Sequence, residues 1–131
     1  MGQLAAKMGD SVTATDIHIV LVPSPGGPVP TPASLPFAGK IASGCCETVF
    51  IDGKPAAVAG SMAVNEPPHV PPDGTFQVPP TNQATIISGS ETVLIGGLPA
   101  VRNGDTALTC NDPAPLPEGS VVVAAGTVLV G

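Results

Sequence analysis

The chain contains an internal repeat, and this repeat limits the possible folds more than any other feature of the sequence. The segment Thr48–Ser61 aligns without a gap on the segment Thr92–Asp105, which lies 44 residues further along. A third copy is split between the chain ends, with Thr127–Gly131 as its first half and Leu4–Asp10 as its second half. A repeat at a fixed spacing indicates copies of one structural unit packed against one another. Three copies that close through the chain ends predict a fold with pseudo-threefold symmetry.

Each copy has the pattern of a β-hairpin. The runs Thr48–Ile51 and Thr92–Ile95 are short and rich in β-branched residues, which favours strands. Asp52-Gly53 and Gly96-Gly97 follow them, and such pairs suit tight hairpin turns because both residues tolerate a positive φ. No stretch of the chain shows a sustained helical period of apolar residues. We therefore predict a mostly β fold with very little helix.

The composition agrees with a folded chain that is rich in turns. Gly (16) and Pro (17) are abundant, yet 43% of the residues are hydrophobic and only 11% are charged, which is the opposite of a disordered chain. The prolines gather in three connections, which we interpret as extended surface loops with polyproline character: Val22–Phe37, Glu66–Pro80 and Asn111–Glu118. We expect residues 1–131 to form a single domain, whose third repeat is completed by residues 1–10 and 120–131.

Charge and hydropathy exclude several classes of partner. The net charge is −6 with four basic residues, and Trp and Tyr are absent, so neither a phosphate-binding patch nor a base-stacking surface for nucleic acid can form. The N-terminus lacks the apolar stretch of a secretory signal, and the apolar run Val121–Val130 is too short to span a bilayer. We expect the chain to be made and kept in the cytoplasm. Three cysteines, two of them adjacent, do not indicate a disulfide framework.

The two histidines occupy the same position in successive repeats. His18 is nine residues after Gly9, and His69 is nine residues after Gly60. In the third connection Cys110 stands near the corresponding position, and imidazole and thiolate are ligands that suit a tetrahedral zinc site. We predict that His18, His69 and Cys110 converge to bind a metal ion. The alternative is that both histidines are exposed loop residues and Cys110 is a buried small side chain.

The fourth ligand stays open at this stage. A water, an anion and several side chains at nearby repeat positions are candidates: Asn65, Glu66, Asp16 and Asp112. Cys46 aligns with Ser90 and Ala125 in the other repeats, so we interpret it as a packed small residue and not as a ligand or a redox group. Catalytic motifs such as a nucleophile elbow, a zinc-protease helix or a phosphate loop are absent from the sequence, while a Cys-His pair at Cys110 stays possible.

The ends of the three repeats resemble PAAR (Pro-Ala-Ala-Arg) repeats. The matching segments are Leu4–Asp10, Lys54–Ser61 and Leu98–Asp105, each combined with a Thr-Val strand. The resemblance implies a conical β domain of three pseudo-threefold hairpin repeats, with one structural zinc ion near the apex bound by His18, His69 and Cys110. The sequence has only two histidines where the family pattern has three, and the arginine of the motif survives only as Arg102.

The resemblance also implies a function. PAAR proteins cap the trimeric spike of contractile injection machines, which include type VI secretion systems, extracellular contractile injection systems and phage-like tails. It implies one non-enzymatic tip per spike trimer, which pierces the target membrane mechanically, can attach an effector or cargo, and leaves the cell on contraction. Two alternatives from other classes are a small zinc-dependent hydrolase or effector domain, and a free-standing β-rich adhesion module.

Overall fold

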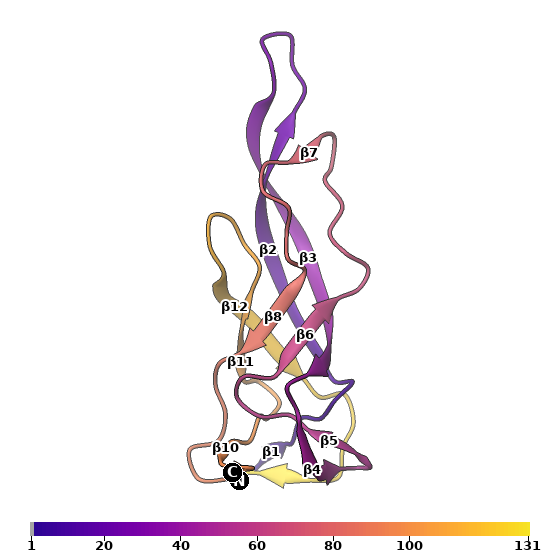
Figure 1. The fold of residues 1–131 in the computed structure, drawn as a ribbon, viewed down its shortest axis with the longest axis vertical. Coiled ribbons are helices and arrows are strands. Elements are labelled where there is room, and N and C mark those ends of the chain that lie inside the picture. The colour runs from indigo at the N-terminus through magenta and orange to yellow at the C-terminus, as the bar shows by residue number, and fades with distance from the viewer. Residues whose placement is uncertain (1) are drawn as a thin grey trace.

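The computed structural model describes residues 2–131, and these residues form strands and no helix, so the prediction of a mostly β fold is confirmed. Met1, the first residue of the predicted third repeat, lies outside the described residues. Figure 1 shows an elongated, tapering molecule with both chain ends at its broad end. The strands are β1 (Gln3–Leu4), β2 (Ser11–Val22), β3 (Val29–Ser43), β4 (Cys46–Ile51), β5 (Lys54–Ala56), β6 (Met62–Asn65), β7 (Thr75–Phe76), β8 (Gln83–Ile86), β9 (Leu94–Ile95), β10 (Leu98–Pro99), β11 (Thr106–Thr109), β12 (Leu116–Val122) and β13 (Leu129–Val130).

Six strands close into a barrel in the middle of the molecule. They are hydrogen-bonded in the order β12-β11-β8-β6-β3-β2, and β12 pairs with β2 to complete the circle. The interior is filled mainly by Ala, Val and Ile side chains around one buried aromatic ring, Phe37. Small side chains suit this position because a narrow barrel leaves little room inside. A core of this kind explains how a chain almost without aromatic residues folds.

Three two-stranded hairpins form the broad end of the molecule, which we call the base (Figure 1). They are β4–β5, β9–β10 and β1–β13, and the last of these joins the two chain ends with Gln3 opposite Val130. The turn residues Asp52 and Gly53 both have positive φ (51° and 83°), and Gly96 and Gly97 do as well (60° and 86°). The hairpin and turn predictions are therefore confirmed.

A ring of backbone hydrogen bonds connects the three repeats. The amide of Ala6 donates to the carbonyl of Val101 (2.9 Å), Val101 donates to Ala57 (3.1 Å), and Ala57 donates back to Ala6 (3.0 Å). These three residues occupy one position of the repeat, and all of them are fully buried. The closed ring confirms the pseudo-threefold symmetry at the level of individual atoms.

Each repeat ends in the same turn. The glycine of the turn has a φ of 93°, 98° or 92° at Gly9, Gly60 and Gly104, a conformation that other residues adopt only with strain. The next side chain accepts a hydrogen bond from the amide three residues before it, as a turn of this type requires. The three pairs are Asp10 with Lys7 (2.9 Å), Ser61 with Val58 (3.0 Å) and Asp105 with Arg102 (2.7 Å).

The first proline-rich connection differs from the prediction. β3 begins at Val29, and residues 29–40 pair with the whole of β2, so the interpretation of residues 29–37 as a loop was wrong and only residues 23–28 turn. The reason is the spacing of Pro30, Pro32 and Pro36. Alternate residues of a strand direct their N–H groups to the same side, so the missing donors of all three prolines fall on one edge. That edge needs no donors, because β6 pairs with β3 only from Gly39 onward.

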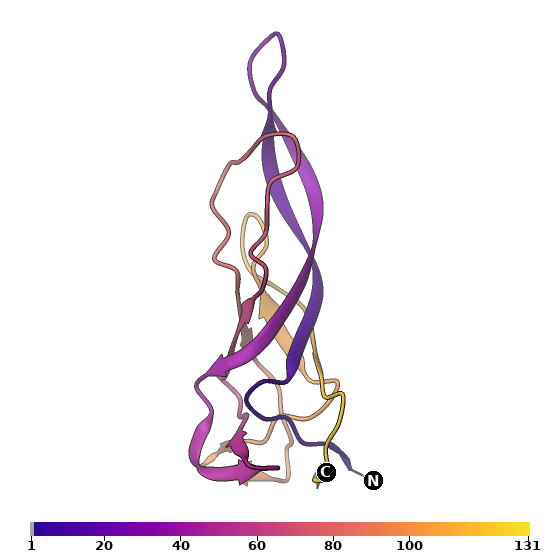
Figure 2. The ribbon, with the colours of Figure 1, turned by 90° about the vertical axis from the view of Figure 1, so that its right-hand side faces the viewer.

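The second connection, residues 66–82, lies against the β2–β3 hairpin, and we call it the strap (Figure 2). Its short strand β7 pairs with the far end of β2, and Gln77 donates to the carbonyl of Ile19 (2.9 Å). Gly74 permits this contact, since a Cβ there would lie 2.1 Å from the carbonyl oxygen of Leu21. The third connection is shorter than predicted, because β12 begins at Leu116.

Candidate metal centre

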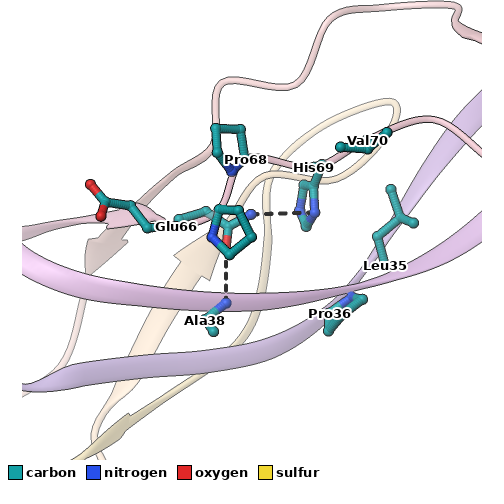
Figure 3. Close-up of a pocket in the computed structure, with 9 residues that line it drawn as sticks. Leu35, Pro36, Ala38, Glu66, Pro68, His69 and Val70 are labelled. Atoms are coloured by element: carbon teal, nitrogen blue, oxygen red, sulfur yellow. Dashed lines mark hydrogen bonds between the residues drawn. The ribbon is translucent and has the colours of Figure 1, made fainter.

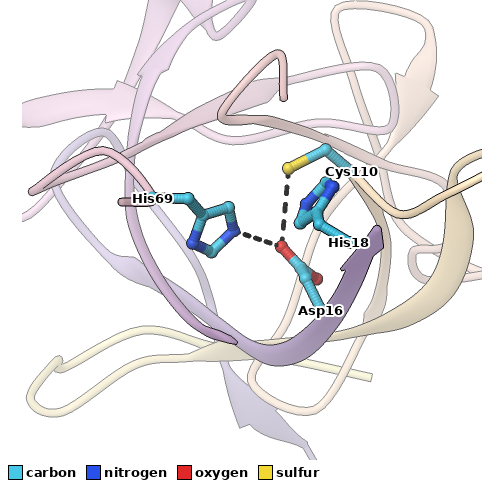
Figure 4. Close-up of side chains that lie close together, drawn as sticks. All are labelled: Asp16, His18, His69 and Cys110. Carbon is cyan, nitrogen blue, oxygen red and sulfur yellow. Dashed lines mark hydrogen bonds and ion pairs between the residues drawn. The ribbon is translucent and has the colours of Figure 1, made fainter. Parts of the chain in front are cut away.

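Four side chains that can bind a metal ion meet in the upper part of the molecule, between the barrel and the tip of the β2–β3 hairpin. Asp16, His18, His69 and Cys110 each offer one ligand atom, and these atoms all lie within 4.8 Å of one another (Figure 4). All four side chains are buried, with exposed fractions of 0% for Asp16, 1% for His18 and 2% for His69. A buried cluster of carboxylate, imidazole and thiol groups could bind a metal ion.

The elements that carry these residues come from three distant parts of the chain. Asp16 and His18 are two residues apart on β2, so both side chains lie on its inward face. His69 belongs to the strap, and Cys110 directly follows β11. His18 and His69 therefore share a repeat position but differ in local structure. The reason is that β6 ends at Asn65, before a Pro-Pro pair, whereas β2 continues to Val22.

Asp16 is the centre of the hydrogen bonds within the cluster. Its Oδ2 atom lies 2.9 Å from Nε2 of His69 and accepts a hydrogen bond from Sγ of Cys110 at 3.5 Å (Figure 4). Its Oδ1 atom accepts a hydrogen bond from the amide group of Asn111 at 3.4 Å. A fully buried carboxylate needs such partners because transfer of a charge out of water is costly.

The side-chain amide of Asn65 contacts the His69 ring on the side that faces away from Asp16. Asn65 accepts a hydrogen bond from the amide of Ala38 through Oδ1 (2.9 Å), so its Nδ2 atom faces Nδ1 of His69 at 3.3 Å. Asn82 accepts hydrogen bonds from the backbone amide of His69 (2.8 Å) and from Asn65 (3.2 Å). Figure 3 shows Leu35 and Val70 beside the His69 ring, in a surface pocket of about 280 Å³.

His18 is the unsatisfied member of the cluster. Neither of its ring nitrogens has a hydrogen-bond partner, although both are buried. Its ring lies 5.1 Å from the His69 ring and 5.8 Å from the Phe76 ring, and Phe37 lies 6.1 Å from His69. A buried polar atom without a partner destabilises a fold by about 1–3 kcal/mol. A metal ion bound to one nitrogen would remove this cost at that nitrogen, so the residues present fit a metal ion.

The chemistry of Cys110 argues against a nucleophile. Burial raises the pKa of its thiol to about 11, and the nearby Asp16 carboxylate adds to the shift. The thiol is therefore neutral at physiological pH, and a neutral buried thiol is a poor nucleophile. It becomes a thiolate only when a cation such as a metal ion compensates the charge.

The structure brings together all three predicted residues, His18, His69 and Cys110, and one of the four candidates for the fourth ligand, Asp16, lies in the same cluster. The alternating pattern Asp16-x-His18 on a strand was the signal that could have identified Asp16. The other candidates lie around the cluster: Asn65 contacts His69, Asp112 lies beside His18, and Glu66 is exposed.

The adjacent cysteines do not belong to the cluster. Cys45 is half-buried against the barrel core, and burial raises its pKa. Cys46 is also half-buried, and hydrogen bonds with Thr48 lower its pKa. Of the three aligned residues Cys46, Ser90 and Ala125, only Ser90 is fully buried. The predicted close packing of this position is therefore found in one repeat and not in all three.

A closed barrel on a threefold base, with a buried cluster of potential metal ligands above it, defines a small conical β domain. The family model of the PAAR motif matches residues 21–114 and 76–131, and the chain belongs to this family. A comparison with curated proteins gave no match. Among residues 2–131 there is no helix of the length and hydropathy needed to cross a membrane.

Proposed function

We propose that this protein is the non-enzymatic tip that caps the trimeric central spike of a contractile injection machine. The observation that carries the proposal is a set of three equivalent apolar side chains on the base. Phe50, Leu94 and Leu129 occupy one position of the repeat, and they are 59%, 62% and 63% exposed. Large apolar side chains that stand out together on a surface favour a binding interface.

The arrangement of the base explains why the partner is expected to be a trimer. In each hairpin the residue after the exposed one faces inward. These inward residues pack into one hydrophobic cluster on the inner side of the base, and they are Ile51, Ile95 and Val130. The exposed side chains therefore project from a shared support with pseudo-threefold symmetry. A partner with exact threefold symmetry would meet each of them with an equal surface, which gives one tip for three spike chains.

The proposal includes a structural zinc ion, one per chain, held by Asp16, His18, His69 and Cys110. A tetrahedral site with nitrogen, oxygen and sulfur ligands suits zinc, and the negative charges of Asp16 and Cys110 would balance the ion. The ion would connect β2, the strap and the end of β11. This connection supplies stability where the molecule becomes too narrow for a hydrophobic core.

The proposed role is mechanical. The tip would be kept in the cytoplasm until assembly, and contraction would carry it outward through the target membrane. The burial of Cys110 among the proposed zinc ligands supports the absence of cysteine-based catalysis. Membership of the PAAR family also extends the proposal to attachment of an effector or cargo.

Coexpression with a trimeric spike protein from the same machine, followed by native mass spectrometry, tests the proposal. We expect a complex of one chain with three spike chains. The triple variant Phe50→Asp, Leu94→Asp, Leu129→Asp should abolish the complex. The matched control replaces Val29, Val70 and Val78 by Asp, because these exposed apolar residues lie away from the base hairpins. A complex that survives the base variant, or a ratio other than one to three, would contradict the proposal.

A further inference from the structure

The two residues that follow Cys110 are hydrogen-bonded to β2 at the residues on either side of His18. Asn111 accepts a hydrogen bond from the amide of Ile17 through Oδ1 (2.7 Å), and the amide of Asp112 donates to the carbonyl of Ile17 (2.8 Å). The carboxylate of Asp112 accepts a hydrogen bond from the amide of Ile19 through Oδ2 (2.8 Å). The position of the Asp112 carboxylate relative to β2 is therefore fixed.

This fixed carboxylate faces one nitrogen of His18. Oδ2 of Asp112 lies 3.5 Å from Nδ1 of His18, and both side chains are almost fully buried (10% and 1% exposed). Both ring nitrogens of His18 are buried without a hydrogen-bond partner, and Nδ1 is the one that lies beside a carboxylate. A carboxylate beside Nδ1 favours the tautomer that carries its proton there, which leaves the lone pair of Nε2 free.

We propose that Asp112 is a positioning residue for the metal centre, which orients His18 and keeps its proton on Nδ1 so that Nε2 can bind the ion. This inference rests on the proposed metal site. In this proposal Asp112 contacts the ligand His18 and does not bind the metal ion itself, whereas the sequence had made it a candidate for the fourth ligand. A carboxylate in this place also raises the basicity of the imidazole toward the metal ion.

A purely structural role for Asp112 is the competing explanation, because its hydrogen bond to Ile19 alone could justify the residue. The variant Asp112→Asn separates the two. An asparagine keeps the size of the side chain and an oxygen that accepts from Ile19, but it removes the charge beside Nδ1. Glu118→Gln is the matched control, since it removes one exposed negative charge from β12.

The experiment measures the affinity of the full chain for Zn²⁺ by competition with a chelator, together with the thermal unfolding of the metal-free proteins. We expect Asp112→Asn to bind Zn²⁺ about 10–100-fold more weakly than the wild type, as loss of such a partner does in other sites. Its metal-free unfolding temperature should match the wild type, and Glu118→Gln should change neither quantity.

Equal Zn²⁺ affinity of Asp112→Asn and the wild type would overturn the role of Asp112 alone. A wild type that binds no Zn²⁺ would overturn the metal site and this role together. A measurement on the wild type guards against a variant that fails to fold: long-range ¹H–¹⁵N spectra of the Zn²⁺-loaded protein should show His18 protonated at Nδ1 and metal-bound at Nε2. The reverse assignment would overturn the proposal.

Discussion

The base and the upper part of the molecule are stabilised by different means. The base repeats one set of backbone hydrogen bonds and one turn three times, from Ala6 and Ala57 to Val101. The upper part, which comprises the β2–β3 hairpin from residue 15 to 36, the strap and residues 110–115, has no repeated pattern of this kind among the described residues. There, single side chains such as Asp16 and Asn111 connect segments that are distant in the chain.

This difference indicates how each region tolerates change. The turns and the ring bonds of the base are each present in three equivalent copies, so loss of one copy leaves two others. Among residues 2–131 the metal-ligand cluster of the upper part occurs once. Within it, the ring nitrogens of His18 have no hydrogen-bond partner, and a bound metal ion would provide one. The base should therefore fold without a metal ion, whereas the upper part should depend on one.

The largest expected effect is removal of the metal ligands. With metal at about 1,000 times its dissociation constant, binding contributes about 4 kcal/mol to stability. The double variant His18→Ala, His69→Ala should lose this contribution and bind no zinc, and its melting temperature should fall by about 10 °C or more. Elemental analysis and calorimetry check this. In the presence of a chelator the wild type should lose most of its advantage, and a variant that retains zinc would contradict the four-residue site.

The second effect compares two equivalent turn residues of the base. Asp105 accepts hydrogen bonds from the backbone and side chain of Arg102 and from Ser88, whereas Ser61 accepts only from Val58 and donates to Gly44. Asp105→Ala should destabilise by about 2 kcal/mol, since hydrogen bonds to charged groups contribute more, and Ser61→Ala by about 1 kcal/mol. Urea unfolding measures both. The opposite order would show that neighbouring repeats, and not these bonds, set the cost.

The third effect tests the symmetry of the base. Gly9, Gly60 and Gly104 have nearly the same positive φ, so replacement of each by Ala should cost about 1 kcal/mol or more, and the three costs should agree closely. Gly27, in the turn of the β2–β3 hairpin, also has a positive φ (108°) and provides a control outside the base. Widely different costs at the three base positions would mean that the repeats are not energetically equivalent.

The smallest effect concerns the pH dependence of one contact at the base. Hydrogen bonds from the side chain and the amide of Thr127 lower the pKa of Asp52 below its ordinary value of 3.8. A lowered pKa in the folded state contributes stability above the ordinary pKa, and this stability is lost as the pH falls through the folded value. Asp52→Asn should therefore reduce the slope of stability against pH in the acidic range. Asp73→Asn is the control, because Asp73 also has a positive φ. Identical slopes in the two variants would contradict the contact.

The base could be predicted from the sequence because its structure is encoded locally. Asp52-Gly53, Gly96-Gly97 and the glycines at the repeat ends each specify a turn, and the repeat spacing specifies how the turns combine. The upper part could be predicted only in outline. His18 and His69 were found through their shared repeat position. Asp16 was left among four candidates, because its alternation with His18 places both side chains on one face only when residues 11–22 are known to form a strand.

The β2–β3 hairpin shows the other limit of the sequence. Pro30, Pro32 and Pro36 suggested a loop, because proline is usually excluded from sheets. The three prolines are an even number of residues apart, so an edge strand could hold all of them with their nitrogens on the unpaired side. That conclusion required knowing that β6 pairs with β3 only from Gly39 onward. Long-range pairing of this kind leaves no local signal in the chain.

Hydrogen exchange with and without zinc tests most directly the claim that the two regions are held by different means. We predict that removal of zinc leaves the amides of Ala6, Ala57 and Val101 protected, while those of His69 and Gln77 in the strap exchange much faster. Equal loss of protection in the base and the strap, or no change in the strap, would contradict this claim.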